Sequence, residues 1–241
     1  MDIPPIIALD QVSFAYAGGP TILDQASFSM TETQHIGLYG PNGSGKSTLF
    51  HLLTGLIHPV SGQVYFRGQA VCTEKDFWPV RRDIGLVLQN AEDQLFHPTV
   101  LDDVAFGPLN LGLDPAQARE RAMQTLHELG LEGFENRITH RLSGGEKKLV
   151  SLATILSMHP KVLLLDEPTN GLDPQTRKRI TEIVAALPTA RIIISHDWDF
   201  LARTSSQYLT VRQGKLISDP PLQPHAHTHA HPLGNDSHRH A

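Results

Sequence analysis

The sequence predicts an α/β fold with a largely parallel sheet. Short apolar runs rich in Val and Ile alternate with longer stretches of helical period, which is typical of this fold class. Four of these runs resemble buried strands with polar residues at their C-terminal ends: HIGLYG (35–40), DIGLVLQN (83–90), VLLLDEP (162–168) and RIIISHD (191–197). Ligands of open α/β sheets gather at those ends, so we expect the functional site there.

Other segments predict further structure around this sheet. Residues 6–16 and 26–34 alternate apolar with polar side chains, which favours an N-terminal antiparallel β subdomain. From Gln89 to about Met158 helical periodicity replaces the strand pattern, so we expect an inserted helical subdomain at about 90–160. From about Asp219 the sequence turns to Pro, His, Gly, Asn and Ser without an apolar period. We therefore expect one domain at 1–218 and a disordered His-rich tail at 219–241.

Composition excludes several classes of function. The chain has 241 residues and a formal net charge of −5, so nucleic acid is not expected as a partner. Its one cysteine, Cys72, cannot form an internal disulfide, and MDIPPIIALD does not have the layout of a signal peptide. The longest apolar runs are shorter than the ~20 residues that span a bilayer. We expect a cytosolic protein that leaves any work inside a membrane to another chain.

The segment GPNGSGKST fits the phosphate-binding loop of P-loop NTPases, G-x-x-x-x-G-K-[ST], and lies between a predicted strand and a predicted helix. Backbone N–H groups of such a loop surround a phosphate, Lys46 reaches the β and γ oxygens, and the Ser47 hydroxyl contacts Mg²⁺. A glycine-rich turn could match by chance, and kinases, GTPases and ATPases share the loop. The predicted binding residues are Gly40, Pro41, Asn42, Gly43, Ser44, Gly45, Lys46, Ser47 and Thr48.

Two carboxylates follow the run VLLL. Neighbouring strand residues point to opposite faces, so Asp166 and Glu167 are expected to have different roles. Asp166 would hold Mg²⁺ through its water shell, while Glu167 would orient and polarise the attacking water, a contribution of typically ~10²–10⁴ in rate. The alternative is a solvated strand end before the turn EPTNGLDP.

The segment LSGGEKK (142–148) combines a helix start with two glycines. Ser143 and Glu146 have the spacing of a capping box. Capping does not explain Gly144 and Gly145, which cost helix stability and leave backbone N–H groups open to close approach. We therefore expect a second anion site.

The three motifs, in this order and spacing, resemble the nucleotide-binding subunit of an ABC ATPase. The resemblance implies ATP and Mg²⁺ as cofactors, and a head-to-tail dimer in which the signature loop of one subunit covers the γ-phosphate held by the other. Both halves of that composite site are present here, so a homodimer is expected, although the family usually has Gln where this chain has Glu146. The signature residues are Leu142, Ser143, Gly144, Gly145 and Glu146.

The resemblance also assigns roles to single residues. Gln89 matches the residue that senses Mg²⁺, so that Ser47, Gln89 and Asp166 form the expected Mg²⁺ site. Asp173 matches the loop that crosses between subunits, and His196 matches the histidine that contacts the γ-phosphate. Tyr16 matches the aromatic residue that stacks on adenine; an ordinary core or surface tyrosine is the alternative.

The segments EDQLF (92–96) and DDVAFGP (102–108) resemble the ATPases of energy-coupling-factor importers, which take up vitamins and transition metals. In those proteins the segment after the sensing Gln contacts a membrane-embedded transmitter subunit. An ordinary amphipathic helix edge is the alternative reading of these residues. The resemblance implies a peripheral ATPase at the cytoplasmic face of the membrane, with transmitter and metal-specificity subunits as partners.

The tail carries six histidines. Imidazole binds Ni, Co, Zn and Cu alike, so these residues indicate a metal without selecting one. The expected function is therefore ATP-driven import of cobalt or nickel. A non-transport ABC ATPase that serves soluble metal delivery or assembly is the alternative, and the absence of N-K-x-D disfavours a GTPase. The tail could also be an expression tag or bind metal incidentally. Its expected ligands are His225, His227, His229, His231, His238 and His240.

Overall fold

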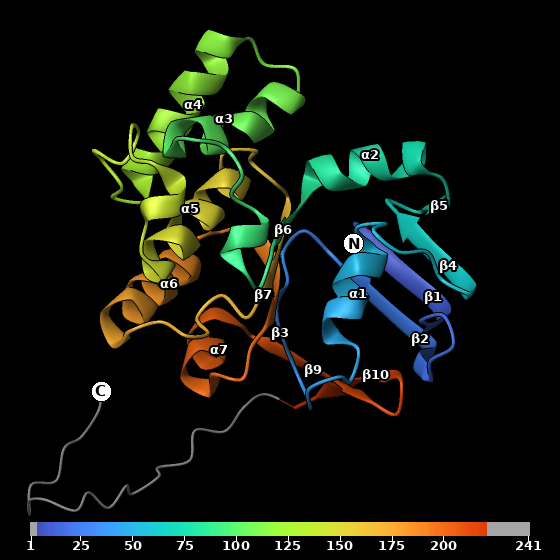
Figure 1. Ribbon diagram of the computed structural model, residues 1–241. Coiled ribbons are helices and arrows are strands. Elements are labelled where there is room, and N and C mark those ends of the chain that lie inside the picture. Colours follow the sequence, from blue (N-terminus) through green and yellow to red (C-terminus); the bar gives the residue numbers. More distant parts are fainter. Residues whose placement is uncertain (1–3, 221–241) are drawn as a thin grey trace, which may run out of the picture.

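The computed structural model describes residues 4–220. The histidines predicted as metal ligands, from His225 to His240, lie outside the described residues. Figure 1 shows two β-sheets on either side of helix α1, with a group of helices beyond the larger sheet. No helix in the described part of the chain has the length and apolar character needed to cross a bilayer.

The larger sheet has six strands in the order β10-β9-β3-β8-β7-β6. The four predicted buried strands are confirmed and pair in parallel: β3 (His35–Tyr39), β6 (Ile84–Val87), β7 (Val162–Asp166) and β8 (Ala190–Ile194). Strand β9 (Gln207–Arg212) extends the parallel set, and β10 (Lys215–Asp219) returns antiparallel beside it. Asp219 therefore belongs to a strand, one residue beyond the predicted end of the domain.

The smaller sheet is antiparallel, with the order β2-β1-β4-β5. The predicted N-terminal pair is confirmed as β1 (Ile7–Ala15) and β2 (Thr21–Met30). Strands β4 (Ser61–Phe66) and β5 (Gln69–Val71) complete the sheet.

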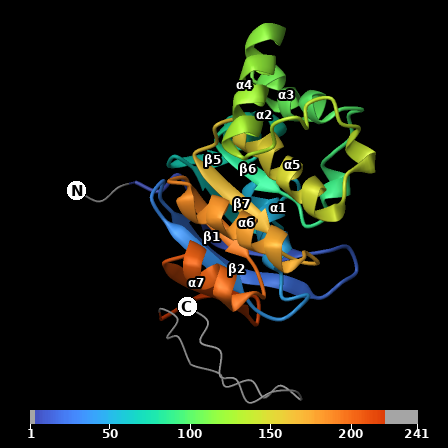
Figure 2. The ribbon, with the colours of Figure 1, turned by 90° about the vertical axis from the view of Figure 1, so that its left-hand side faces the viewer.

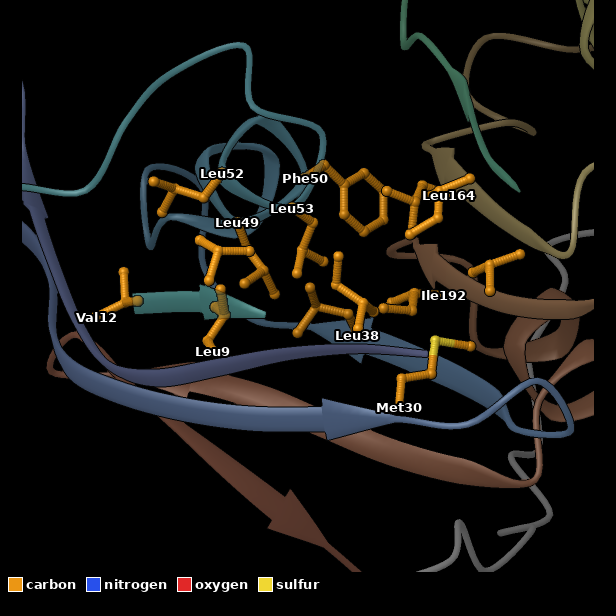
Figure 3. Close-up of a cluster of buried hydrophobic side chains, with 14 of the residues drawn as sticks. Leu9, Val12, Met30, Leu38, Leu49, Phe50, Leu52, Leu53, Leu164 and Ile192 are labelled. Carbon is orange, nitrogen blue, oxygen red and sulfur yellow. The ribbon is translucent and has the colours of Figure 1, made fainter. Parts of the chain in front are cut away.

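Helix α1 (Lys46–Leu53) lies between the two sheets and is buried on most of its surface. Figure 3 shows its apolar side chains meeting Leu9, Val12 and Met30 from the small sheet and Leu38, Leu164 and Ile192 from the large one. Helix α1 thus begins directly after the phosphate loop and also lies at the centre of the core.

The strands of the large sheet present alternate residues to two cores. On β7, Val162 and Leu164 face α1, while Leu163 and Leu165 face the second cluster. That second cluster includes α6 (Pro174–Ala186) and α7 (Trp198–Thr204), which lie across the sheet in Figure 2. Because both faces are covered, these strands read as continuous apolar runs.

The stretch expected to be helical contains α3 (Val100–Asn110), α4 (Pro115–Glu128) and α5 (Gly144–Leu156), with short 3₁₀ turns η1 (Ala91–Asp93) and η2 (Thr139–Arg141). Helices α3 and α4 pack against α5 in the second core cluster. Helix α2 (Glu74–Asp83) precedes β6. The 3₁₀ turn η1, shortly after Gln89, contacts α5, and the first turn of α5 carries the LSGGE segment.

Candidate active site

The phosphate loop joins β3 to α1, as the sequence predicts. Gly45 precedes α1 with φ +104°, and a Cβ added there would lie 2.7 Å from Ile22 Cγ2, so only glycine fits without displacement. No side chain caps the start of α1. Its first backbone N–H groups are therefore available to an anion, and the helix dipole favours negative charge at the same place.

Lys46 lies in the first turn of α1 and is largely buried. Its Nζ donates hydrogen bonds to the carbonyl oxygens of Gly40 at 2.8 Å and Pro41 at 2.9 Å. Burial lowers the pKa of the Lys46 ammonium, while the carboxylates of Glu167 and Asp166 act in the opposite direction. The side chain is held at the loop, beside the two acids.

Asp166 ends β7, and Glu167 follows it with φ +47°, in the left-handed region. The alternation of a strand predicts opposite faces for the two side chains, but both line one cavity because Glu167 has left the strand. Burial raises the pKa of each carboxyl. The Ser47 hydroxyl opposes the rise of the Asp166 pKa, and His196 opposes that of Glu167.

His196 stands opposite the acids, just after β8. Its Nε2 lies 3.4 Å from Glu167 Oε1 and 3.1 Å from Asn42 Oδ1. The histidine therefore connects the phosphate loop with the carboxylate that follows β7. A ring nitrogen placed between these two side chains can orient Glu167 and hydrogen-bond an incoming phosphate.

These groups enclose a cavity of about 470 Å³ at the C-terminal ends of the parallel strands. Tyr16 lies at its rim, 49% exposed, packed edge-on against Phe14, with its hydroxyl 3.3 Å from Thr48 Oγ1. The predicted residues that line the cavity are Tyr16, Asn42, Gly43, Gly45, Lys46, Ser47, Thr48, Gln89, Asp166, Glu167 and His196.

Three lining residues were not predicted: Ile22, Asn170 and Ile194. Asn170 lies in the turn EPTNGLDP, and an amide in a turn beside the two acids was a usable signal. Ile22 approaches from the small sheet, a tertiary contact that the local sequence does not encode.

The signature segment does not line this cavity. Ser143 caps α5, and the predicted capping box with Glu146 is confirmed. Glu146 also forms an ion pair with Arg137 at 2.8 Å, and hydrogen bonds from Ser143 lower the pKa of its carboxyl. A Cβ added at Gly144 would meet nothing within 4 Å, so this residue faces open space.

Asp173 also lies away from the cavity. It is the N-cap of α6, where its carboxylate accepts hydrogen bonds from the backbone N–H groups of Gln175 and Thr176. In one chain, therefore, the phosphate loop and the signature segment belong to separate surfaces.

A family model described as ABC transporter matches residues 23–170. The chain belongs to the ABC transporter family of ATPases. A putative ABC transporter ATP-binding protein of Nitratidesulfovibrio vulgaris is 54% identical over 98% of this chain and 86% of its own length. The cobalt import ATP-binding protein CbiO of Rhodobacter capsulatus is 40% identical over 89% of this chain and 78% of its own.

Solved structures agree with this assignment. CbiO1 of Clostridium perfringens, described as part of the transporter complex cbiONQ, superposes with a TM-score of 0.78 at 33% identity, covering 89% of this chain and 87% of the other. The cassette MJ0796, solved as a dimer with ADP and phosphate, gives a TM-score of 0.80 at 26% identity, covering 91% and 100%. The energy-coupling factor transporter ATP-binding protein EcfA of Methanothermobacter thermautotrophicus is 41% identical over 89% of this chain and 70% of its own length, which is consistent with an ABC ATPase of the energy-coupling-factor type.

Proposed function

We propose that this chain is an ATP-hydrolysing subunit that dimerises head-to-tail and powers import of cobalt or nickel through separate membrane subunits. The observation that carries the proposal is the composition of the cavity, where a phosphate loop, Lys46, two acids and His196 converge on one volume. The signature segment of the same chain points elsewhere, which suits a site completed by a second subunit.

The donor set fits Mg²⁺. Ser47, Gln89 and Asp166 bring hydroxyl, amide and carboxylate oxygens to the same cavity, and hard oxygen ligands are what Mg²⁺ prefers. When bound there together with the nucleotide, the ion neutralises charge on the β- and γ-phosphates. The phosphate loop and Lys46 hold those phosphates, and Tyr16 at the rim offers its ring to the adenine base.

Hydrolysis then needs a placed water. Glu167 accepts a proton from water as the water oxygen attacks the γ-phosphorus, and the bond from that phosphorus to the β–γ bridging oxygen breaks, giving ADP and phosphate. His196 orients Glu167 across 3.4 Å and contacts the γ-phosphate. Burial raises the pKa of Glu167, which makes its carboxylate a better proton acceptor.

The signature segment supplies the second half of the site in a dimer. Ser143 and Gly144 are exposed at the start of α5, and the dimer of MJ0796 is a structural relative that assembles from two such cassettes. Because this chain carries both halves, two copies suffice. Asp173, exposed as the cap of α6, is the residue that we place across the subunit boundary.

The segment after Gln89 offers a surface for a transmitter subunit. Phe96, His97 and Phe106 form an aromatic cluster with ring centroids 4.5–5.0 Å apart. Phe96 is 65% exposed and Phe106 39% exposed. A groove of about 740 Å³ adjoins the cluster, lined in part by Leu95, Pro98, Ile138 and His140. An exposed aromatic patch beside a groove is suited to binding an apolar helix of a membrane partner.

Uptake measurements test the proposal. Cells that produce this chain with its membrane subunits should accumulate radioactive Co²⁺ or Ni²⁺, and the Glu167→Gln chain should abolish that uptake. Comparing the two ions identifies the cargo. The subunit, which we place at the cytoplasmic face of the membrane, should also purify with the membrane subunits from detergent extracts. ATP hydrolysis without such association, and without an effect on uptake, would instead favour the soluble metal-delivery alternative.

A further inference from the structure

Lys148 is a buried charge that the cavity does not use. It lies in the second turn of α5, is 8% exposed, and is not among the cavity's lining residues. Its Nζ donates a hydrogen bond to the carbonyl oxygen of Gln89 and lies 3.4 Å from the carbonyl oxygen of Glu167. One ammonium group therefore contacts the backbone at the ends of two neighbouring strands, β6 and β7.

The placement has an electrostatic cost and a compensation. Burial lowers the pKa of the Lys148 ammonium, and the nearby carboxylates of Asp166 and Glu167 act in the opposite direction. A buried ammonium is costly unless it is paired and hydrogen-bonded. The carbonyl groups of Gln89 and Glu167 and the carboxylates of Asp166 and Glu167 supply those partners. Because Lys148 belongs to α5, it connects these four groups to that helix.

A second contact fixes the backbone on the other side of Gln89. The amide N–H of Leu88 donates to Gln94 Oε1 at 3.1 Å, while Gln94 Nε2 donates to Ser151 O at 2.8 Å and Thr154 Oγ1 at 2.7 Å, both on α5. The backbone is thus held to α5 through Leu88 N and through Gln89 O. The side chain of Gln89 projects into the cavity from between these two contacts.

We infer that Lys148 is a positioning residue for hydrolysis in its own subunit: it holds the backbones of Gln89 and Glu167 against α5, the helix whose first turn serves the partner subunit's ATP. The inference rests on the proposed function, because only a head-to-tail dimer gives α5 this double role. Lys148 does not line the cavity that we assign to the nucleotide. It acts by fixing the positions of the Gln89 amide and the Glu167 carboxylate relative to each other.

Removal of the ammonium should slow chemistry and spare binding. Lys148→Met keeps the aliphatic stem, so we expect ATP affinity to change less than about twofold while kcat falls roughly 10²-fold, the loss typical of a misplacement near 1 Å. Lys148→Arg, which keeps a cation that can reach both carbonyls, should recover part of kcat. Lys147→Met is the matched control. Lys147 is the preceding residue on α5 and pairs with exposed Glu92, so the kcat of this variant should stay within about twofold of the wild type.

Mixed dimers decide in which subunit Lys148 acts. Co-produced, differently tagged chains carry Lys46→Ala in one subunit and Gly144→Asp in the other, so the remaining site combines the phosphate loop of the second with the signature segment of the first. Lys148→Met added to the second chain, beside the working Gln89 and Glu167, should abolish most turnover. The same change in the first chain should leave most of it.

The outcomes are distinct. An unchanged kcat for Lys148→Met, or a loss confined to the chain that supplies only the signature segment, would overturn the inference. If Lys148→Met does not fold, as judged by thermal unfolding, Lys148→Gln replaces it under the same criteria. An inactive parental mixture would instead reject the composite site, and the kcat of the homodimeric variants would still test whether Lys148 supports turnover.

Discussion

Replacing Glu167 by Gln tests the assignment of the catalytic base. The amide keeps the size of the side chain and its place 3.4 Å from His196, but it cannot take a proton from water. A positioned base contributes ~10²–10⁴ in rate, which corresponds to a barrier higher by about 3–5 kcal/mol, so kcat should fall by that factor. Binding of Mg²⁺ and ATP should remain near normal, because Lys46, Ser47 and Asp166 are untouched.

The same change has a stability signature with a defined sign. Burial raises the pKa of the Glu167 carboxyl in the folded chain, so the native state disfavours its charged form. That penalty is absent below the unfolded pKa of about 4.3 and grows as the pH rises through the folded value. We therefore expect the nucleotide-free Glu167→Gln chain to gain thermal stability relative to the wild type between pH 4 and neutrality.

Phosphate release, nucleotide affinity and gel filtration with ATP provide the assays. The variant should bind ATP, fail to release phosphate and accumulate as an ATP-trapped dimer. Turnover within twofold of the wild type would refute the role of Glu167. A loss of ATP binding equal to the loss of turnover would instead show that the side chain holds the nucleotide rather than the water.

Three further outcomes are expected. Gly144→Asp should leave the fold and the ATP affinity of one subunit intact, since a Cβ there meets nothing within 4 Å, but it should abolish turnover. Mixing this variant with Lys46→Ala chains should restore turnover, and no recovery would contradict the head-to-tail site. Gly45→Ala should lower the free energy of unfolding by about 1–3 kcal/mol in chemical denaturation, because φ is +104° and the new Cβ lies 2.7 Å from Ile22 Cγ2; an unchanged stability would show that the loop relaxes freely. Truncation before His225 should leave ATP hydrolysis unchanged and reduce calorimetric binding of Co²⁺ and Ni²⁺, which in the full chain weakens as the pH falls through about 6.5; equal binding by both chains would remove the tail as a ligand.

Strands β3, β6, β7 and β8 of the large sheet were predictable because each is a largely buried apolar run with polar residues at or just after its C-terminal end. The hairpin of β9 and β10 was missed, although its turn residues Gln213 and Gly214 both have positive φ, as a tight two-residue turn requires. Gln-Gly is a weaker turn signal than Asn-Gly, and β10 is short and partly exposed, so its apolar pattern is faint.

The residues of the candidate site likewise fall into those that local sequence identifies and those that depend on tertiary contacts. Motif residues such as Lys46 and Asp166 could be identified from local spacing, because strand, loop and helix are adjacent in sequence. Glu167 lines the same cavity as Asp166, whereas strand alternation predicts opposite faces, because a positive φ at a non-glycine residue is imposed by surrounding structure. Lys148 meets carbonyl groups 59 and 19 residues distant, and carbonyl partners leave no mark in a sequence.

Helix α1 places its first turn at the phosphate site and its body in the centre of the core. Ligand affinity at that turn is therefore added to the global unfolding free energy, by RT ln(1 + [ATP]/Kd). Amide hydrogens of α1 and the strands around it should exchange more slowly with solvent as nucleotide binds. Gly144, exposed in the first turn of α5 and outside this core, gains none of that protection within one subunit, so slowed exchange at Gly144 reports on the arrival of the second subunit.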